Sequence, residues 1–355
     1  MKKNLRRWLW LVFVAIVIGL IFYNLSGSPE WRNFSWRHLW ATLSGARPGL
    51  LLVVLALVYT SYFLRAYRWR YFMHPIKRAS LGVLFAGQVL GFCSIFLVGR
   101  VGEIVRPAYI AKRENVSMSS MLAVLVLERV YDTIALVLLF AASLYFNPVT
   151  PSTARGEWVL HEGGFIMFWA AGILLAGLVI LRLYAEGVTA WLLRRVHFLP
   201  ARTLQGFEHF LHSFVEGLGL IRNVTGLLGS VVSTVVLWTV NTTVFWLVFQ
   251  SLRGGLARLP WVAAALTLFC AALGLAVQLP GVGGGYQVGA ILALTEIFSV
   301  APESATGAGI LLWIMISVPC LALGLVLLLH EGLTIGKLEK IAEEEQQQTA
   351  TLTDA

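Results

Sequence analysis

The sequence has little charge. Only 13% of its 355 residues are Asp, Glu, Lys or Arg, and 58% are hydrophobic, whereas roughly a quarter of a soluble domain is charged. Several apolar runs of about 20 residues follow one another, and each is long enough to cross a bilayer. The shortage of charge therefore excludes a soluble globular protein, and the apolar runs predict an all-α polytopic membrane protein.

Cysteine and metal-ligand patterns are also scarce. Cys93, Cys270 and Cys320 lie in apolar runs without paired spacing, which excludes a disulfide framework. The histidines form no HExxH or comparable pattern, so we expect neither a metal nor a cofactor. No basic soluble segment accompanies the net charge of +9. The excess of Lys and Arg therefore indicates topology and contact with anionic lipid, and excludes a nucleic-acid partner.

The distribution of Lys and Arg distinguishes two topologies. If every long apolar run crosses the membrane, the basic residues divide almost evenly between its two sides. If Leu81–Val98 and Trp261–Leu279 instead enter and turn back, most basic residues fall on one side, as cytoplasmic loops require. We therefore expect about six full transmembrane helices and two re-entrant helical hairpins entering from opposite faces, with both termini in the cytoplasm.

The chain shows no linker or soluble segment, so residues 1–335 are expected to form a single transmembrane domain. Within it we expect re-entrant hairpins at about 81–111 and 261–300, and an interfacial amphipathic region at about 182–222. The second span is expected from about Gly49 to Leu64, followed by a basic cluster that begins at Arg65, and Met118–Phe146 is expected to form one long helix. Residues 336–355 are polar and are expected to form a disordered cytoplasmic tail.

Six charged side chains cluster within or beside the apolar runs: Arg100, Glu103, Arg106, Glu128, Arg129 and Asp132. A charge at bilayer depth is costly, which makes each a candidate for function. Glu128 and Asp132 are four residues apart and share a helix face, and Arg129 is spaced to pair with Asp132. Glu128 then needs another cation, and Arg100 and Arg106 are the nearest in sequence.

Two interpretations of this cluster stay open. Three positive and three negative side chains balance, which is typical of a closed structural network. Alternatively, Arg100 and Arg106 hold an anionic head group while the acids orient them, because the guanidinium fork suits phosphate.

A second candidate site is the turn LPGVGGGYQ (Leu279–Gln287), which carries no charge. Its glycines permit positive φ and close approach of a ligand, and amides at the start of the next half-helix can bind an anion. A packing turn between helices is the alternative. The candidate ligand contacts are Gly283, Gly284, Gly285, Tyr286 and Gln287.

These motifs resemble a known family. GRVGEIVRP (Gly99–Pro107) followed by LERVYD (Leu127–Asp132) is similar to the first signature of the lysylphosphatidylglycerol synthase transmembrane-domain family of flippase-like membrane proteins. LPGVGGGYQ resembles the second signature, in which an acid usually stands at the position of Gln287. The resemblance covers nearly the whole chain and implies an integral membrane fold with a lipid-linked role. We expect this chain to lack the soluble aminoacyl-transfer domain of the bifunctional synthases.

The expected function is a lipid flippase or transporter of the cytoplasmic (inner) membrane. It would bind an anionic lipid or polyisoprenoid-linked head group in a cavity between the two hairpins. Two alternatives stay open: an integral-membrane lipid-modifying transferase with Glu103 or Glu128 as base, and a non-catalytic partner subunit of a lipid or glycan synthesis enzyme. No nucleophile pattern accompanies the acids, so we expect a transporter rather than an enzyme. The expected partners are membrane lipids, and a homo-oligomer or a partner synthase stays open.

Overall fold

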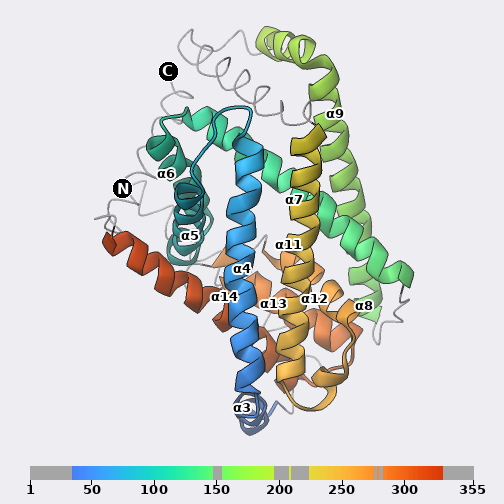
Figure 1. Ribbon diagram of the computed structural model, residues 1–355. Coiled ribbons are helices and arrows are strands. Elements are labelled where there is room, and N and C mark those ends of the chain that lie inside the picture. Colours follow the sequence, from blue (N-terminus) through green and yellow to red (C-terminus); the bar gives the residue numbers. More distant parts are fainter. Residues whose placement is uncertain are drawn as a thin grey trace, which may run out of the picture.

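The computed structural model describes residues 34–146, 154–195, 208, 224–275, 278–279 and 283–330. These residues are almost all helical (Figure 1). In chain order the elements are α3 (Trp36–Ser44), α4 (Pro48–Met73), α5 (Leu81–Val98), the 3-10 helix η1 (Gly99–Ile104), α6 (Val105–Glu114), α7 (Met118–Phe146), α8 (Ala154–Trp158), the π-helix η2 (Val159–Gly163), α9 (Gly164–Arg195), α11 (Val224–Ser251), the 3-10 helix η4 (Gly254–Arg258), α12 (Trp261–Gly274), strands β1 (Gln278–Leu279) and β2 (Gly283–Gly284), α13 (Gly285–Leu292), the π-helix η5 (Ala293–Ile297) and α14 (Pro302–His330).

The described part of the chain has four helical stretches that are long and apolar enough to cross a membrane: Pro48–Met73, Gly156–Gly177, Gly226–Ser251 and Pro302–Leu329. The 29-residue helix α7 is also long enough, but its middle carries charge. The predicted all-α membrane fold is confirmed at this level. The predicted amphipathic region 182–222 lies mostly, and the predicted tail 336–355 wholly, outside the described residues.

The outer surface is apolar, as contact with acyl chains requires. Large hydrophobic side chains stand out along α9, α11 and α14, including Ile173 (68% exposed), Val235 (60%) and Val326 (60%). Figure 1 shows α4 and α11 running side by side while α7 crosses them obliquely. This arrangement leaves one face of α7 against α4 and α11, away from lipid.

The segment from α5 to α6 folds back on itself. The carboxylate of Glu114, at the end of α6, accepts a hydrogen bond from the backbone N–H of Ser80, at the start of α5 (3.0 Å). The turn between them begins at Gly99, whose φ of 75° suits glycine. Gly91 lets α6 approach closely, since a Cβ there would lie 2.6 Å from Cβ of Arg106. The two ends of the segment are therefore neighbours, and η1 forms its tip.

A second folded-back segment consists of α12 and α13. The 14 residues of α12 reach only about 21 Å, less than the roughly 30 Å of a hydrocarbon core. Strands β1 and β2 pair antiparallel between the two helices, with Gln278 opposite Gly284. Residues 280–282 of the turn lie outside the described residues. Because β1 contacts η1, the tips of the two folded-back segments lie next to each other.

Candidate functional site

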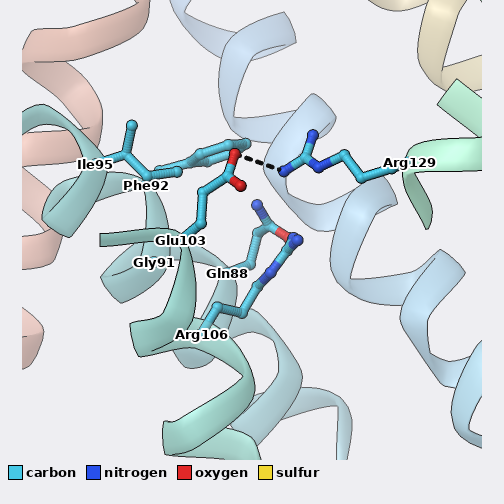
Figure 2. Close-up of a pocket in the computed structure, with 7 residues that line it drawn as sticks. All are labelled: Gln88, Gly91, Phe92, Ile95, Glu103, Arg106 and Arg129. Carbon is cyan, nitrogen blue, oxygen red and sulfur yellow. Dashed lines mark hydrogen bonds and ion pairs between the residues drawn. The ribbon is translucent and has the colours of Figure 1, made fainter. Parts of the chain in front are cut away.

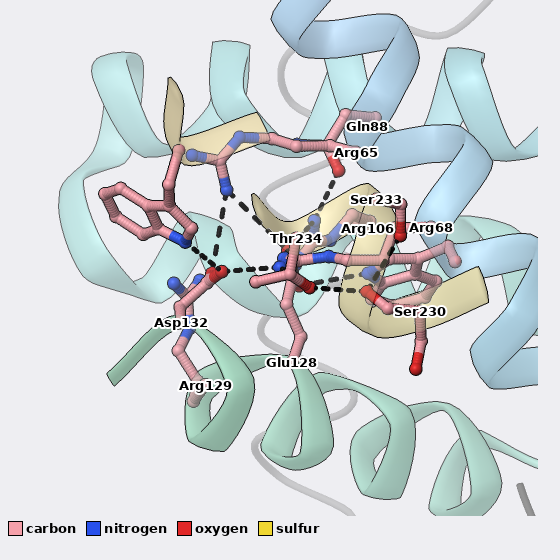
Figure 3. A network of polar contacts seen from close by, with 12 residues as sticks. Arg65, Arg68, Gln88, Arg106, Glu128, Arg129, Asp132, Ser230, Ser233 and Thr234 are labelled. Carbon is pink, nitrogen blue, oxygen red and sulfur yellow. Dashed lines mark hydrogen bonds and ion pairs between the residues drawn. The ribbon is translucent and has the colours of Figure 1, made fainter. Parts of the chain in front are cut away.

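The charged cluster is centred on two acids of α7 and an arginine of α4 (Figure 3). Arg68 donates from Nη2 to Oε1 of Glu128 (3.0 Å) and from Nη1 to Oδ1 of Asp132 (2.7 Å). The spacing of the two acids, four residues apart on one helix face, matches the two Nη groups of one guanidinium. Arg65, one turn earlier on α4, lies farther off, with Nη1 3.8 Å from Glu128 Oε1 and 3.7 Å from Asp132 Oδ2.

Arg106, from the first folded-back segment, binds the other side of Glu128. Its Nη2 donates to Oε2 of Glu128, and its Nη1 donates to the side-chain oxygen of Gln88. The guanidinium also lies 4.4 Å from the ring centre of Trp69, a cation–π contact. The indole of Trp69 in turn donates to Oε2 of Glu128 (3.0 Å). Of the two cations that the sequence offered for Glu128, Arg100 and Arg106, the structure pairs Arg106 with it.

Helix α11 adds two hydrogen bonds to the cluster, while Nε of Arg68 has no partner among the described residues. Thr234 Oγ1 accepts from Arg68 (3.3 Å), and the indole of Trp238 donates to Asp132 (3.3 Å). Arg68 and Glu128 are 0% exposed, and Asp132 is 7% exposed. Removing one partner of a buried ion pair of this kind costs about 3–5 kcal/mol. These contacts hold α4, α7, α11 and the first folded-back segment together.

Arg65 and Arg68 are members of the charged cluster that sequence reasoning missed. It placed the end of the second span at Leu64 and assigned the arginines beyond it to a loop. Helix α4 instead continues to Met73, which places both arginines inside the helix. The sequence feature that could have identified them is their spacing of three residues, which places both arginines on one face of α4, where they can pair with the two acids of α7.

Two further expectations need correction. The predicted pair of Arg129 with Asp132 is wrong: Arg129 Nη2 binds Oε1 of Glu103 at 3.2 Å, because Asp132 faces α4. The expected balance of three positive and three negative side chains is also wrong. The described side chains of the cluster include four arginines, Arg65, Arg68, Arg106 and Arg129, against the acids Glu103, Glu128 and Asp132, which leaves 4 − 3 = +1. The side chain of Arg100 lies outside the described residues.

A small pocket opens beside this cluster (Figure 2). Its cavity volume is about 10 Å³, roughly the room that one water molecule needs, so a phosphate enters only when the lining side chains move apart. Lipid- and drug-sized ligands need about 300–1,000 Å³. The residues that line it are Gln88, Gly91, Phe92, Ile95, Glu103, Arg106 and Arg129.

The amide of Gln88 is the unusual group in this pocket. Its oxygen accepts from Arg106, which fixes the orientation of the amide and turns the NH₂ group toward the pocket between Glu103 and Arg129 (Figure 2). Gln88 is 1% exposed, and its Nε2 has no hydrogen-bond partner among the described residues. A buried amide without a partner is costly. The pocket therefore offers donors from Gln88, Arg106 and Arg129 to a group with acceptors.

The second predicted site does not join this cluster. Gln287 Oε1 accepts from the backbone N–H of Gly284 (3.1 Å) and so caps the start of α13. The ring of Tyr286 packs edge-on against Phe245 of α11, with ring centres 5.9 Å apart. Gly283 pairs with Leu279 in the short ladder, and Gly285 begins α13. None of these residues lines the pocket of Figure 2.

The geometry limits what the acids can do chemically. Glu128 accepts hydrogen bonds from two arginines and an indole. Because both oxygens of its carboxylate already accept charge-assisted hydrogen bonds, it is poorly suited to act as a base. Glu103 is more accessible, with a side chain 32% exposed. No group of three or more His, Cys, Asp or Glu that could hold a metal ion is found in the described part of the chain.

Comparison with known protein families gives a match over most of the chain. A family model described as the lysylphosphatidylglycerol synthase TM region matches residues 8–324 of the chain. A search of curated proteins found no match.

Proposed function

This chain belongs to the family of the lysylphosphatidylglycerol synthase TM region, and from that premise we propose that it moves an anionic lipid across the membrane. The family and the apolar helices make it an integral membrane protein tied to lipid metabolism. In this proposal the phosphate of a lipid or polyisoprenoid-linked head group binds in the pocket lined by Gln88, Arg106 and Arg129.

The observation that carries the proposal is the unpartnered Nε2 of Gln88 beside two arginines. An unbalanced positive charge at bilayer depth is costly without an anion. The described cluster has one more arginine than acids, and its pocket has an unpartnered donor. A phosphate supplies both the missing charge and the missing acceptors.

The two outer members of the cluster form the gate of this site. Arg129 and Glu103 pair at 3.2 Å with side chains 46% and 32% exposed, and an exposed pair contributes about 0–1 kcal/mol. Glu128 is held by several donors at 0% exposure. An entering phosphate therefore displaces Glu103 from Arg129 and leaves Glu128 in place.

The proposed membrane arrangement is about six full crossings with two re-entrant hairpins entering from opposite faces. The adjacent ends of α5 and α6 support the first hairpin, and the shortness of α12 supports the second. Both termini then lie in the cytoplasm and residues 1–335 form one transmembrane domain. Non-helical backbone at the adjacent tips is tolerated at depth where it is buried in protein or lines a cavity.

The proposal is tested by Gln88→Glu. This change keeps the oxygen that Arg106 binds, so the fold is expected to persist, but it replaces the unpartnered donor with a negative oxygen that repels phosphate. The protein would be reconstituted in vesicles with acyl-labelled fluorescent phosphatidylglycerol, and transfer between leaflets would be followed by quenching with dithionite. Gln250→Glu, at the far end of α11, is the matched control.

We expect Gln88→Glu to lose protein-dependent lipid transfer and Gln250→Glu to keep it. Arg106→Ala is expected to lose transfer as well. Transfer at the wild-type rate by Gln88→Glu would refute the site.

A further inference from the structure

Helix α14 carries three buried polar atoms that lack partners. These are Thr306 Oγ1, Trp313 Nε1 and Ser317 Oγ, none of which has a hydrogen-bond partner in the described part of the chain. Ser317 as a whole is 1% exposed. Buried polar groups are nearly always paired with protein or water, so three on one helix require an explanation.

Other hydroxyls in the apolar helices show what is missing. The hydroxyls of Thr60, Ser143 and Thr267 each donate to the carbonyl four residues earlier, at 2.7–2.8 Å. This back-bonding is the usual solution for Ser and Thr in membrane helices. Thr306 and Ser317 do not use it, which leaves their hydroxyls free for another group.

The three unpartnered side chains lie on one face of α14. They fall in steps of three and four residues with Gly309, Cys320 and Gly324, and such steps mark a single face of a helix. Residues 306 to 317 span about 16 Å along the axis. We call Thr306, Trp313 and Ser317 the polar ridge of α14.

The glycines on the same face show which segments flank the ridge. A Cβ on Gly309 would lie 3.0 Å from Cγ1 of Ile291 in α13, and a Cβ on Gly324 would lie 2.6 Å from Cβ of Cys93 in α5. Cys320 donates to the carbonyl of Val89, also in α5 (3.7 Å). Trp313 and Ser317 therefore lie between the contact of α14 with α13 and its contact with α5, and Thr306 lies about one turn before Gly309.

From this placement we infer that the polar ridge borders a hydrated passage along α14, through which the phosphate of the lipid moves between the two hairpins. The inference rests on the proposed transport function and names its route. The two hydroxyls and the indole N–H all donate hydrogen bonds, so they suit water and a phosphate. Because the ridge has no charge, the phosphate is held there more weakly than in the pocket with Arg106, as movement requires.

Hydration of the ridge is tested by cysteine labelling. In a background with the three native cysteines replaced by alanine, Thr306→Cys and Ser317→Cys would be exposed in vesicles to a charged, membrane-impermeant thiosulfonate reagent. Thr267→Cys, whose parent hydroxyl is buried and back-bonded, is the control. We expect the ridge positions to react at least about tenfold faster than position 267, because reaction requires access and an ionised thiol. Equal, slow reaction at all three positions overturns the passage.

A transport experiment separates this inference from the proposed function. Ser317→Ala and Thr306→Val together remove both hydroxyls of the ridge and leave the pocket intact. We expect transfer of labelled phosphatidylglycerol to fall about tenfold while the amount of anionic lipid retained by the purified protein stays at the wild-type level. Unchanged transfer by the double variant overturns the passage and leaves the pocket proposal standing. Loss of retained lipid by Gln88→Glu supports the pocket whatever the double variant does. Thermal unfolding of each variant identifies any loss of fold.

Discussion

Replacing Arg68 with methionine removes the buried guanidinium that donates to both acids of α7. Arg68 is 0% exposed, at 3.0 Å from Glu128 and 2.7 Å from Asp132. Breaking a buried ion pair costs about 3–5 kcal/mol. Arg65 already lies 3.7 Å from Asp132 and compensates in part, so we expect Arg68→Met to lower the free energy of unfolding by about 3 kcal/mol.

Two variants make this prediction specific. The double variant Arg68→Met/Asp132→Asn removes one charge of each sign. Its loss of unfolding free energy is therefore expected to be about 1–2 kcal/mol smaller than the sum of the losses in the two single variants. Arg129→Met is the matched control, since its side chain is 46% exposed and pairs with the partly exposed Glu103. The control is expected to cost at most about 1 kcal/mol.

The assay is equilibrium unfolding in mild detergent with increasing denaturant, followed by tryptophan fluorescence or far-ultraviolet circular dichroism. The reasoning fails if Arg68→Met is as stable as Arg129→Met. It also fails if the effects of Arg68→Met and Asp132→Asn simply add, because the two groups would then not be energetically coupled.

Three further predictions concern the pocket and the packing around it. Glu103→Gln removes the carboxylate that competes for Arg129, so retention of anionic lipid is expected to rise up to about fivefold; a fall in retention would contradict the displacement step. Gly91→Ala places a Cβ 2.6 Å from Arg106 and is expected to cost about 1–3 kcal/mol, whereas Gly82→Ala on the same helix has open space and should melt like the wild type. Tyr62→Phe removes a 2.6 Å hydrogen bond to the carbonyl of Ile316, near Pro319, and should cost about 0.5–1.5 kcal/mol in the same unfolding assay.

Much of the fold could be predicted because a membrane helix is recognised in a sequence by its length and its apolar residues. The bounds expected for Leu81–Val98 and Met118–Phe146 agree with α5 and α7. The end of α4 was missed because its last turns carry arginines and aromatic residues, which read as the edge of the bilayer. Arg65 and Arg68 are instead paired with acids of α7, and a partner that distant in sequence leaves no local signal.

The sequence predicted which residues belong to the candidate site better than it predicted which of them form ion pairs. The motif from Gly99 to Asp132 contains Glu103, Arg106 and Arg129, three of the residues that line the pocket. Pairing was guessed from spacing along one helix, which favoured Arg129 with Asp132. Tertiary contacts decided otherwise, since Asp132 faces α4 and Arg129 faces η1. The role of Gln88 depends on which way its amide is turned, and only the contact with Arg106 reveals that.

The most direct test of the account is mass spectrometry of the lipids that stay bound to the purified protein. Wild type and Gln250→Glu are predicted to retain an anionic phospholipid in defined proportion to protein, and Gln88→Glu and Arg106→Ala are predicted to lose it. Equal retention of that lipid by all four proteins would contradict phosphate binding at the pocket.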